Sequence, residues 1–341
     1  MKILIIAPSW VGDMIMAQSL FILLKKNKPN CLIHVMALAW SSPLLSRMPE
    51  VDKIIDMPLG HGKLDIKTRY QLGKSLRHEK YDQTILLPNT LKSALIPYWA
   101  DIPKRTGFTG EIRYGLLNDR RTLDKQILSM TVQRFCALAY DKNDKQISEK
   151  IKLENIPTPL LNIEKENINK TLEQFNLNPD KAILGLCPGA EYGPAKQWPA
   201  EYYAEVALEY IKNNGQVWIF GSEKDNEIAA IINQQTENQC INLCGQTRLG
   251  QAIDLMSLSQ WVISNDSGLM HMAAAVGVPI IGIYGSTDPN FTPPLGNQSA
   301  TITLNLDCSP CFKRTCPLGH NHCLTQLTPD LVKSKIAEFI K

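Results

Sequence analysis

The segment Ser264–His271 has the residue types and spacing to bind an anion. It follows the apolar run Trp261–Ile263 and precedes small apolar residues, so we expect a buried strand, a sharp turn and the start of a helix. Free backbone N–H groups and the positive end of a helix dipole suit a phosphate or diphosphate there. Asp266 and Ser267 are capping residue types, and Gly268 lets a ligand approach the backbone. An ordinary capped helix is the alternative.

A second candidate anion site lies earlier in the same half of the chain. The segment Cys187–Pro199 joins a predicted strand to a predicted helix through a loop with two glycines and three prolines. We expect this rigid loop to place Gly189 and Lys196 against a diphosphate, where the lysine would neutralise a departing nucleoside diphosphate. An exposed surface lysine is the alternative. The second anion-suited junction in this half favours the functional interpretation.

Two carboxylates follow another predicted strand, Gln216–Phe220. A carboxylate just beyond a strand end commonly binds ribose hydroxyls, and both Glu223 and Asp225 occupy such a position. Either could instead serve as acidic charge at a helix N-terminus, and local sequence does not choose between them. Lys196, Glu223 and the turn that ends at His271 would together cradle a nucleoside diphosphate.

Asp13 is the candidate general base. It follows Gly12 and lies in the first turn of a predicted helix, beyond the carboxyl end of the first predicted strand. Ligands of parallel sheets bind at that edge, and a carboxylate there could take the proton of an attacking hydroxyl. A helix-capping aspartate is the alternative. The chain carries no three-glycine dinucleotide fingerprint.

Basic residues near strand ends in the first half are candidates for binding an anionic acceptor. Among them we rank Lys92 and Arg113 first, because charged side chains near these ends could bind acceptor phosphates. Each could instead be a solvated surface charge.

Four cysteines near the end of the chain have metal-ligand spacing. Cys308, Cys311, Cys316 and Cys323 form the pattern C-x2-C-x4-C-x6-C, with two histidines inside it. This spacing suits a structural zinc site, and a reducing compartment favours metal over disulfides. Two disulfides or free thiols are the alternatives. No segment of this kind belongs to the predicted reaction centre, so its role would be structural.

Composition limits the class of protein. The chain has 341 residues, 44% of them apolar and 20% charged, which suits two globular domains. The net charge of +3 does not suggest a nucleic-acid binder. No run of about 18 apolar residues is present, and the start of the chain resembles a strand rather than a signal peptide. We therefore expect a cytoplasmic protein.

Strand and helix patterns alternate along both halves, which predicts parallel sheets covered by helices on both faces. A polar stretch over residues 141–178 holds the predicted boundary between two Rossmann-like domains that face a cleft. The predicted strands are Ile3–Ala7, Leu32–Ala37, Thr84–Leu87, Ala182–Leu186, Gln216–Phe220, Cys240–Leu243, Trp261–Ser264 and Ile280–Tyr284. The predicted helices cover Met14–Leu24, Tyr70–Arg77, Ala200–Lys212, Asn226–Asn233, Leu249–Leu258, Ser267–Val276 and Leu331–Phe339.

Several long segments of the chain closely resemble one enzyme family. The sequences KILIIAPSWVGDMIMAQSL, LPNTLKSALIPYWADIPKRTGFTGEIRYGLLND, CPGAEYGPAKQWP and SNDSGLMHMAAA occur in order and are long enough to be specific. They resemble the heptosyltransferases of glycosyltransferase family 9, and the likeness extends over essentially the whole chain. The resemblance implies an α/β fold of GT-B architecture.

The resemblance also implies the division of labour between domains. Residues 1–160 would bind the acceptor, a heptosylated Kdo2-lipid A in the lipopolysaccharide core. Residues 161–326 would bind ADP-L-glycero-D-manno-heptose. Residues 327–341 would form a helix that crosses back to the first domain. Because the acceptor is a lipid, the protein would make peripheral contact with the cytoplasmic face of the inner membrane.

Site roles follow from the same resemblance. It implies transfer of heptose to the first heptose of the inner core, with inversion and without a required catalytic metal. Asp13 would be the general base, and Lys196 would contact donor phosphate. The turn that wraps the diphosphate and sugar would comprise Asp266, Ser267, Gly268, Leu269 and His271. Transfer to another core position, a nucleotide-sugar 2-epimerase of similar fold and a non-catalytic nucleotide-sugar binder are the competing hypotheses.

Overall fold

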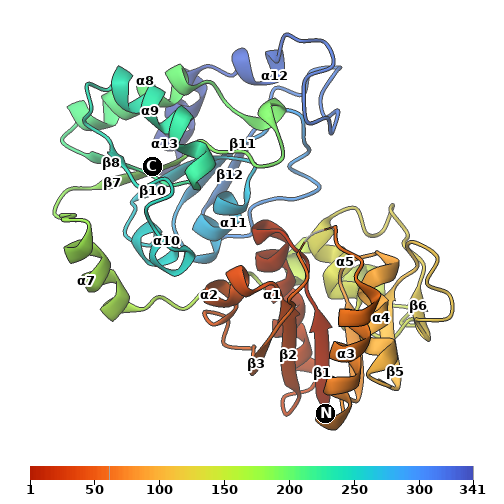
Figure 1. The fold of residues 1–341 in the computed structure, drawn as a ribbon. Coiled ribbons are helices and arrows are strands. Elements are labelled where there is room, and N and C mark those ends of the chain that lie inside the picture. Colours follow the sequence, from red (N-terminus) through yellow and green to blue (C-terminus); the bar gives the residue numbers. More distant parts are fainter. Residues whose placement is uncertain (61, 341) are drawn as a thin grey trace. The chain divides into compact units, whose positions relative to one another are not determined.

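The chain folds into two compact units. The computed structural model describes residues 1–60 and 62–340, and the chain divides into Met1–Pro159 and Leu160–Lys341 (Figure 1). This division falls next to the boundary expected from sequence. Lys341, at the end of the predicted terminal segment, lies outside the described residues.

The first unit is built on a parallel six-stranded sheet with the order β3-β2-β1-β4-β5-β6. The strands are β1 (Lys2–Ile6), β2 (Leu32–Ala37), β3 (Lys53–Asp56), β4 (Gln83–Leu86), β5 (Lys104–Phe108) and β6 (Asp119–Arg121). Its helices are α1 (Val11–Asn27), α2 (Ser42–Leu45), α3 (Ile66–Ser75), α4 (Leu91–Trp99), α5 (Thr131–Ala137) and α6 (Ile147–Lys150). Three short 3-10 helices are η1 (Ala39–Ser41), η2 (Leu76–Glu79) and η3 (Leu153–Asn155).

Apolar side chains hold helices against this sheet. α1 and α5 pack together, as do α3 and α4. One core cluster joins Leu4 and Leu86 of the central strands to Ala94 and Ile96 of α4, all fully buried. Strands β1 and β4 are buried along most of their length, as expected of central parallel strands covered on both faces.

The second unit repeats the architecture with the sheet order β12-β11-β10-β7-β8-β9, again all parallel. Its strands are β7 (Ile183–Cys187), β8 (Gln216–Ile219), β9 (Ile241–Asn242), β10 (Trp261–Asn265), β11 (Ile280–Ile283) and β12 (Ser299–Ile302). Its helices are α7 (Lys165–Gln174), α8 (Ala200–Lys212), α9 (Asn226–Gln235), α10 (Leu249–Met256), α11 (Gly268–Ala275), α12 (His322–Thr325) and α13 (Pro329–Ile340). Two 3-10 helices are η4 (Pro194–Lys196) and η5 (Glu223–Asp225).

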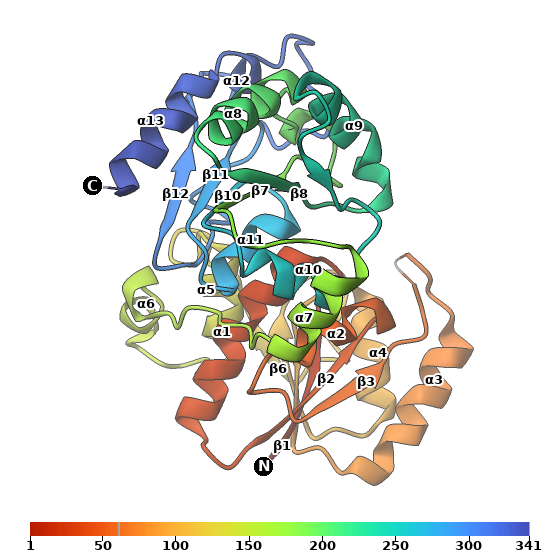
Figure 2. The same ribbon diagram turned by 90° about the vertical axis from the view of Figure 1, so that its left-hand side faces the viewer.

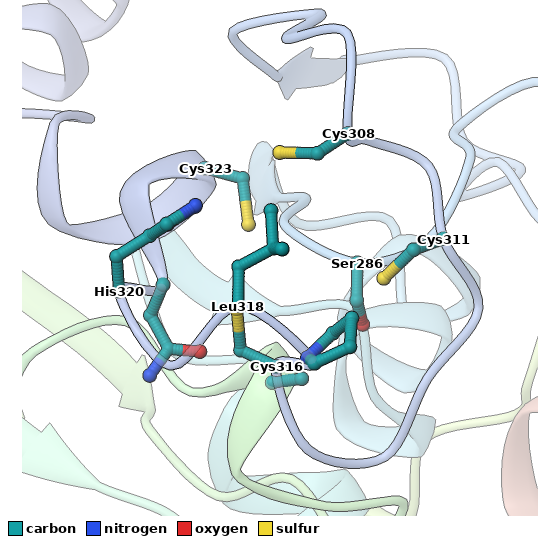
Figure 3. A pocket seen from close by; sticks show the side chains of 10 residues that line it. Ser286, Cys308, Cys311, Cys316, Leu318, His320 and Cys323 are labelled. Atoms are coloured by element: carbon teal, nitrogen blue, oxygen red, sulfur yellow. The ribbon is translucent and has the colours of Figure 1, made fainter.

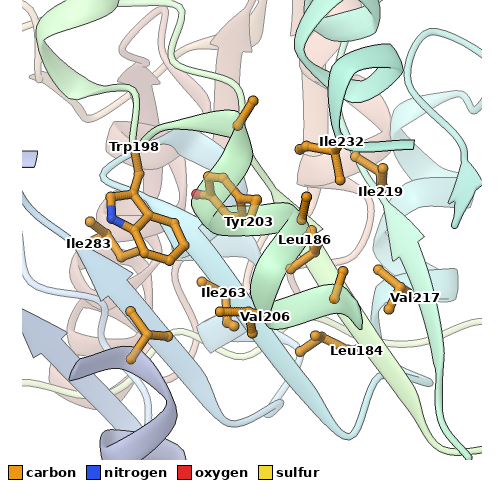
Figure 4. Packing of buried hydrophobic residues seen from close by; sticks show 14 of the residues in the cluster. Leu184, Leu186, Trp198, Tyr203, Val206, Val217, Ile219, Ile232, Ile263 and Ile283 are labelled. Carbon is orange, nitrogen blue, oxygen red and sulfur yellow. The ribbon is translucent and has the colours of Figure 1, made fainter. Parts of the chain in front are cut away.

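The core of the second unit lies between the sheet and helices α8, α9 and α13. Trp198 and Tyr203 pack edge to face, with ring centroids 4.9 Å apart, among buried side chains such as Ile263 and Ile283 (Figure 4). α8, α9 and α13 cover one face of the sheet, and α10 and α11 cover the other (Figure 2). Because helices cover both faces of the sheet, the central strands are expected to be apolar on both faces.

In both sheets the order of the strands reverses beside the first strand of the unit. From this strand the chain adds two strands on one side of the sheet and then crosses over to add three on the other side. In the first unit this reversal lies between β1 and β4, and in the second between β7 and β10. Ligands of open parallel sheets bind beyond the carboxyl ends of strands at such a reversal point. Each reversal point is therefore a place to look for a site.

The structure confirms the doubly wound α/β fold and adds elements that the sequence pattern did not reveal. β3, β5, β6 and β12 are short or partly exposed, and α4 contains Pro97, which argues against a helix. The polar stretch expected to link the domains contains α6 and α7.

The terminal helix α13 packs against α8 and β11 of its own unit. The expected crossing of this helix to the first unit stays a prediction. Within the described residues, no helix is both long enough and apolar enough to cross a membrane.

Candidate functional site

One buried asparagine ties together the two loops at the reversal point of the second unit. Asn265 ends β10, and its Nδ2 donates to the carbonyl oxygen of Pro188, just after β7, at 2.6 Å. Its Oδ1 accepts from the backbone N–H of Trp198 and from the hydroxyl of Tyr203, both at 3.0 Å. Because Asn265 is fully buried with these groups satisfied, the β7 and β10 loops are held in a fixed relation.

Lys196 and Asp266 meet at this point. Lys196 Nζ lies 2.6 Å from Asp266 Oδ2, and the hydroxyl of Thr287 donates to the same oxygen at 2.6 Å. The side chains of Lys196 and Asp266 are only 13% and 5% exposed. The carboxylate thus fixes the position of the ammonium group. Asp266 is predicted to bind the donor, and this geometry gives it the further role of orienting Lys196.

The α11 N-terminus lies directly after Asp266. Ser267 is the N-cap residue, and its side chain makes no capping hydrogen bond. Since the first N–H groups of a helix have no intrahelical acceptor, those of Gly268 and Leu269 are available to an anion. Both residues are half-buried. The local backbone therefore suits an anion at this turn, and anion binding there stays a prediction.

His271 lies in the same helix and is buried. Burial lowers the pKa of its imidazole to about 4, with smaller and opposed effects from Asp266 and Lys196. The side chain is therefore neutral near pH 7 and contributes no charge to the anion site.

Gly189 is placed where only glycine fits. A Cβ atom there would lie 2.3 Å from Asp225 Oδ1. Asp225 Oδ2 accepts from the N–H and the hydroxyl of Ser222, at 2.7 and 2.8 Å, so it caps η5. Glu223 is exposed beside it. The Asp225 carboxylate is thus engaged in capping through Oδ2, whereas Glu223 is exposed, and ribose binding by either residue stays a prediction.

Asp13 and Lys92 lie on the two loops at the reversal point of the first unit. Asp13 is in the first turn of α1, after β1, and Lys92 is in the first turn of α4, after β4. Both residues are half-buried. The structure thus puts the predicted base and one predicted acceptor-binding residue at the same edge of one sheet.

Arg113, the other predicted acceptor-binding residue, is buried. Its side chain is only 1% exposed, and its guanidinium donates to the carbonyl oxygens of Pro88 and Phe108, the former at 2.8 Å, and to the Asn89 side chain at 3.2 Å. Burial lowers its pKa below the usual range. In this arrangement Arg113 supports the loop after β4, and its binding of the acceptor stays a prediction. The burial of Arg113 could not be predicted, because local sequence does not reveal hydrogen bonds to the carbonyl oxygens of other segments.

Arg69 is a second supporting residue that the sequence analysis missed. It is 3% exposed and donates to the carbonyl oxygens of Lys63 and Lys92, at 2.9 and 3.2 Å. It therefore joins the loop before α3 to the start of α4, where Lys92 lies.

The four candidate zinc ligands lie around one small pocket, together with His320 (Figure 3). All four are free thiols, with Cys308 exposed and the others half-buried. Among residues 1–60 and 62–340, however, no group of three or more Cys, His, Asp or Glu side chains is arranged to hold a metal ion. The clustering agrees with the spacing argument, whereas the arrangement is not that of a formed metal site. The structural zinc stays a prediction.

Comparisons with known proteins agree with this geometry. The sequence profile of glycosyltransferase family 9 (heptosyltransferase) matches residues 69–322. The chain is 46% identical to lipopolysaccharide heptosyltransferase 2 of Escherichia coli (strain K12), covering 98% of this chain and 97% of that protein. It is also 46% identical to lipooligosaccharide heptosyltransferase 2 of Haemophilus influenzae, covering 100% and 99%.

A solved structure shows the same fold. The structure of E. coli ADP-heptose lps heptosyltransferase II matches with a TM-score of 0.86 and 42% identity, covering 99% of this chain and 98% of that chain. The similarity therefore extends over both units.

Proposed function

Because the chain belongs to glycosyltransferase family 9 (heptosyltransferase), we propose that it transfers L-glycero-D-manno-heptose from ADP-heptose to the first heptose of the lipopolysaccharide inner core. The observation that carries this proposal is the Lys196–Asp266 pair beside the uncapped N-terminus of α11. Near-full-length relatives named heptosyltransferase 2 support the choice of reaction.

Donor binding is proposed to use the second unit. The diphosphate would accept hydrogen bonds from the backbone N–H groups of Gly268 and Leu269 and from Lys196. Glu223 would bind the ribose, and Gly189 leaves room for the nucleotide to approach the β7 loop. When ADP departs, the same donors stabilise the growing charge on the diphosphate, so the proposed reaction requires no catalytic metal.

The proposed chemical step is one displacement with inversion. A hydroxyl of the acceptor heptose attacks the anomeric carbon, Asp13 takes the hydroxyl proton, and the bond from that carbon to the diphosphate oxygen breaks. The carboxylate holds the proton after transfer, and ADP carries away the electron pair of the broken bond.

The acceptor is proposed to bind the first unit, with peripheral contact to the cytoplasmic face of the inner membrane. The first unit has 24 Lys and Arg residues against 15 Asp and Glu residues, a net charge of +9. A positive surface attracts phosphorylated lipids. Lys92, at the same edge as Asp13, is the proposed contact to acceptor phosphate.

Product analysis with defined acceptors tests the proposal. The full chain is incubated with ADP-heptose and either a core ending in the first heptose or a core lacking it, and the linkage of the product is determined. We expect transfer only to the heptosylated core, with release of one ADP for each heptose transferred.

Donor-only reactions separate the competing functions. An epimerase would convert ADP-heptose without acceptor, and a non-catalytic binder would release no ADP with acceptor present. Transfer to the core lacking heptose would indicate another core position. Any of these three results would overturn the proposal.

The predicted structural zinc is separate from this reaction and has its own test. Metal analysis of protein purified without added metal should find about one zinc per chain, and replacing Cys308 and Cys311 by serine should remove it. A metal-free chain with four titratable thiols would overturn the zinc prediction and leave the transfer reaction untouched.

A further inference from the structure

An aromatic ring beside the donor site carries two cations. Lys196 Nζ lies 4.9 Å from the ring centroid of Tyr192, and the guanidinium carbon of Arg314 lies 5.1 Å from the same centroid. Tyr192 and Lys196 belong to the loop after β7, whereas Arg314 comes from the long segment after β12, more than a hundred residues later. The fold thus brings a second cation to the lysine proposed to bind diphosphate.

The segment that carries Arg314 is fixed to the Lys196 loop by main-chain contacts. The N–H of Ala195 donates to the carbonyl oxygen of Arg314 at 3.0 Å, and the hydroxyl of Tyr192 donates to that of Phe312 at 2.8 Å. A Cβ atom on Gly193 would lie 2.5 Å from the same Arg314 oxygen, so close approach of the two segments requires glycine. Main-chain contacts therefore fix the backbone of Arg314, and the arginine side chain is not needed for this position.

The same segment is also fixed to the loop after β11. The N–H of Phe312 donates to the carbonyl oxygen of Ser286 at 2.7 Å, and the N–H of Ser286 donates to that of Ala195 at 3.3 Å. Ser286 precedes Thr287, which bonds to Asp266. Residues 303–321 lie between β12 and α12 and contain no helix or strand, yet these contacts hold their middle part against the site.

The two cations differ in how their charge is compensated. Lys196 is paired with Asp266, whereas no ion pair of the described residues includes Arg314, which is exposed. Two positive groups lie against one ring, and one carboxylate pairs with Lys196, so positive charge stays available to an anion. Arginine can also bind phosphate oxygens through two parallel hydrogen bonds.

We propose that Arg314 is a second donor-binding cation, which contacts the diphosphate of the nucleotide sugar from the side of Tyr192. This inference rests on the proposed function, since it takes the donor to be an ADP-sugar. It assigns a role to the cysteine-bearing segment, which delivers Arg314 to the site. No local motif marks Arg314, because its position depends on contacts between distant segments.

Calorimetric titration of the full chain with ADP and with adenosine tests this inference. In Arg314→Ala, the affinity for ADP should fall about tenfold, because one charge-assisted phosphate contact is lost. The affinity for adenosine should not change. The main-chain contacts of residues 312 and 314 remain in this variant, so the loop should stay in place, and an unchanged melting temperature checks this.

Two further variants sharpen the result. Lys313→Ala removes the neighbouring exposed cation and should leave ADP affinity unchanged. Arg314→Lys should recover part of the lost affinity. Unchanged ADP affinity in Arg314→Ala, an equal loss for adenosine, or an equal loss in Lys313→Ala would each overturn the inference. Failure of the unaltered chain to bind ADP would instead overturn the proposed donor.

Discussion

The two units share one strand order but differ in charge and in how their edge loops are supported. The first unit has a net charge of +9, and buried arginines support its loops. The second has 12 Lys and Arg residues against 18 Asp and Glu residues, a net charge of −6. Its loops are tied by neutral Asn265. The whole-chain charge of +3 hides this difference.

The difference shows that net charge and local anion binding are separate properties. The acidic unit contains the more clearly arranged candidate anion site, because the helix N-terminus at Ser267 directly follows Asp266, which pairs with Lys196. The net positive charge of the basic unit attracts anionic partners over long distances, but it does not hold any particular atom of a ligand in place. The donor is accordingly proposed to bind the acidic unit, and the acceptor is proposed to bind the basic unit.

Asp13→Asn is expected to have the largest effect. The amide keeps the shape of the carboxylate but is not a base, so kcat should fall about a thousandfold. ADP affinity, assigned to the other unit, should not change. Steady-state kinetics and an ADP titration measure both quantities. Loss of ADP binding in this variant would contradict the division between units.

Arg113→Met should destabilise the first unit by about 3 kcal/mol, since several buried carbonyl oxygens lose their donor. Lys92→Met is the matched control and should change the free energy of unfolding by less than about 0.5 kcal/mol while raising the KM for acceptor. Urea unfolding and acceptor kinetics measure the pair. A stable Arg113→Met protein with a raised acceptor KM would contradict a mainly supporting role and favour acceptor binding by Arg113.

Lys196→Met should lower kcat/KM for the donor about a hundredfold, because the fixed cation no longer stabilises the departing diphosphate. Lys224→Met is the control in the same unit, since Lys224 is exposed and pairs with Glu191. Initial rates at several donor concentrations give the comparison. Equal losses in the two variants would indicate an effect of overall charge only.

His271 should make the second unit sensitive to acid. Its pKa is about 4 in the folded state, below the ordinary 6.5, so the unfolded state binds more protons between these values. The contribution of His271 to stability is complete above pH 6.5 and falls by about 2 kcal/mol between pH 7 and pH 5. Denaturant unfolding at both pH values should show a smaller decline in His271→Gln. An equal decline in both proteins would contradict a buried neutral imidazole.

Much of the fold was predictable because buried parallel strands are apolar on both faces. β2 and α8 lie at the predicted residues, whereas β6 is too short and polar to be recognised and α4 is obscured by Pro97. Of the site, the turn after β10 and the loop after β7 were predictable, since strand ends and glycines mark them.

The remaining features depend on tertiary contacts. The burial of Arg113, the approach of Asp225 to Gly189 and the approach of Arg314 to Tyr192 join residues that local sequence does not connect, in two cases across more than thirty positions. Such contacts follow from how loops meet at one sheet edge, which composition and periodicity do not reveal.

A crystal structure of the full chain with ADP tests most directly whether the diphosphate binds at the N-terminus of α11. We expect phosphate oxygens within hydrogen-bond distance of Lys196 Nζ and of the backbone N–H groups of Gly268 and Leu269. Nucleotide bound at the carboxyl edge of the first unit's sheet, or in the second unit away from α11, would contradict it.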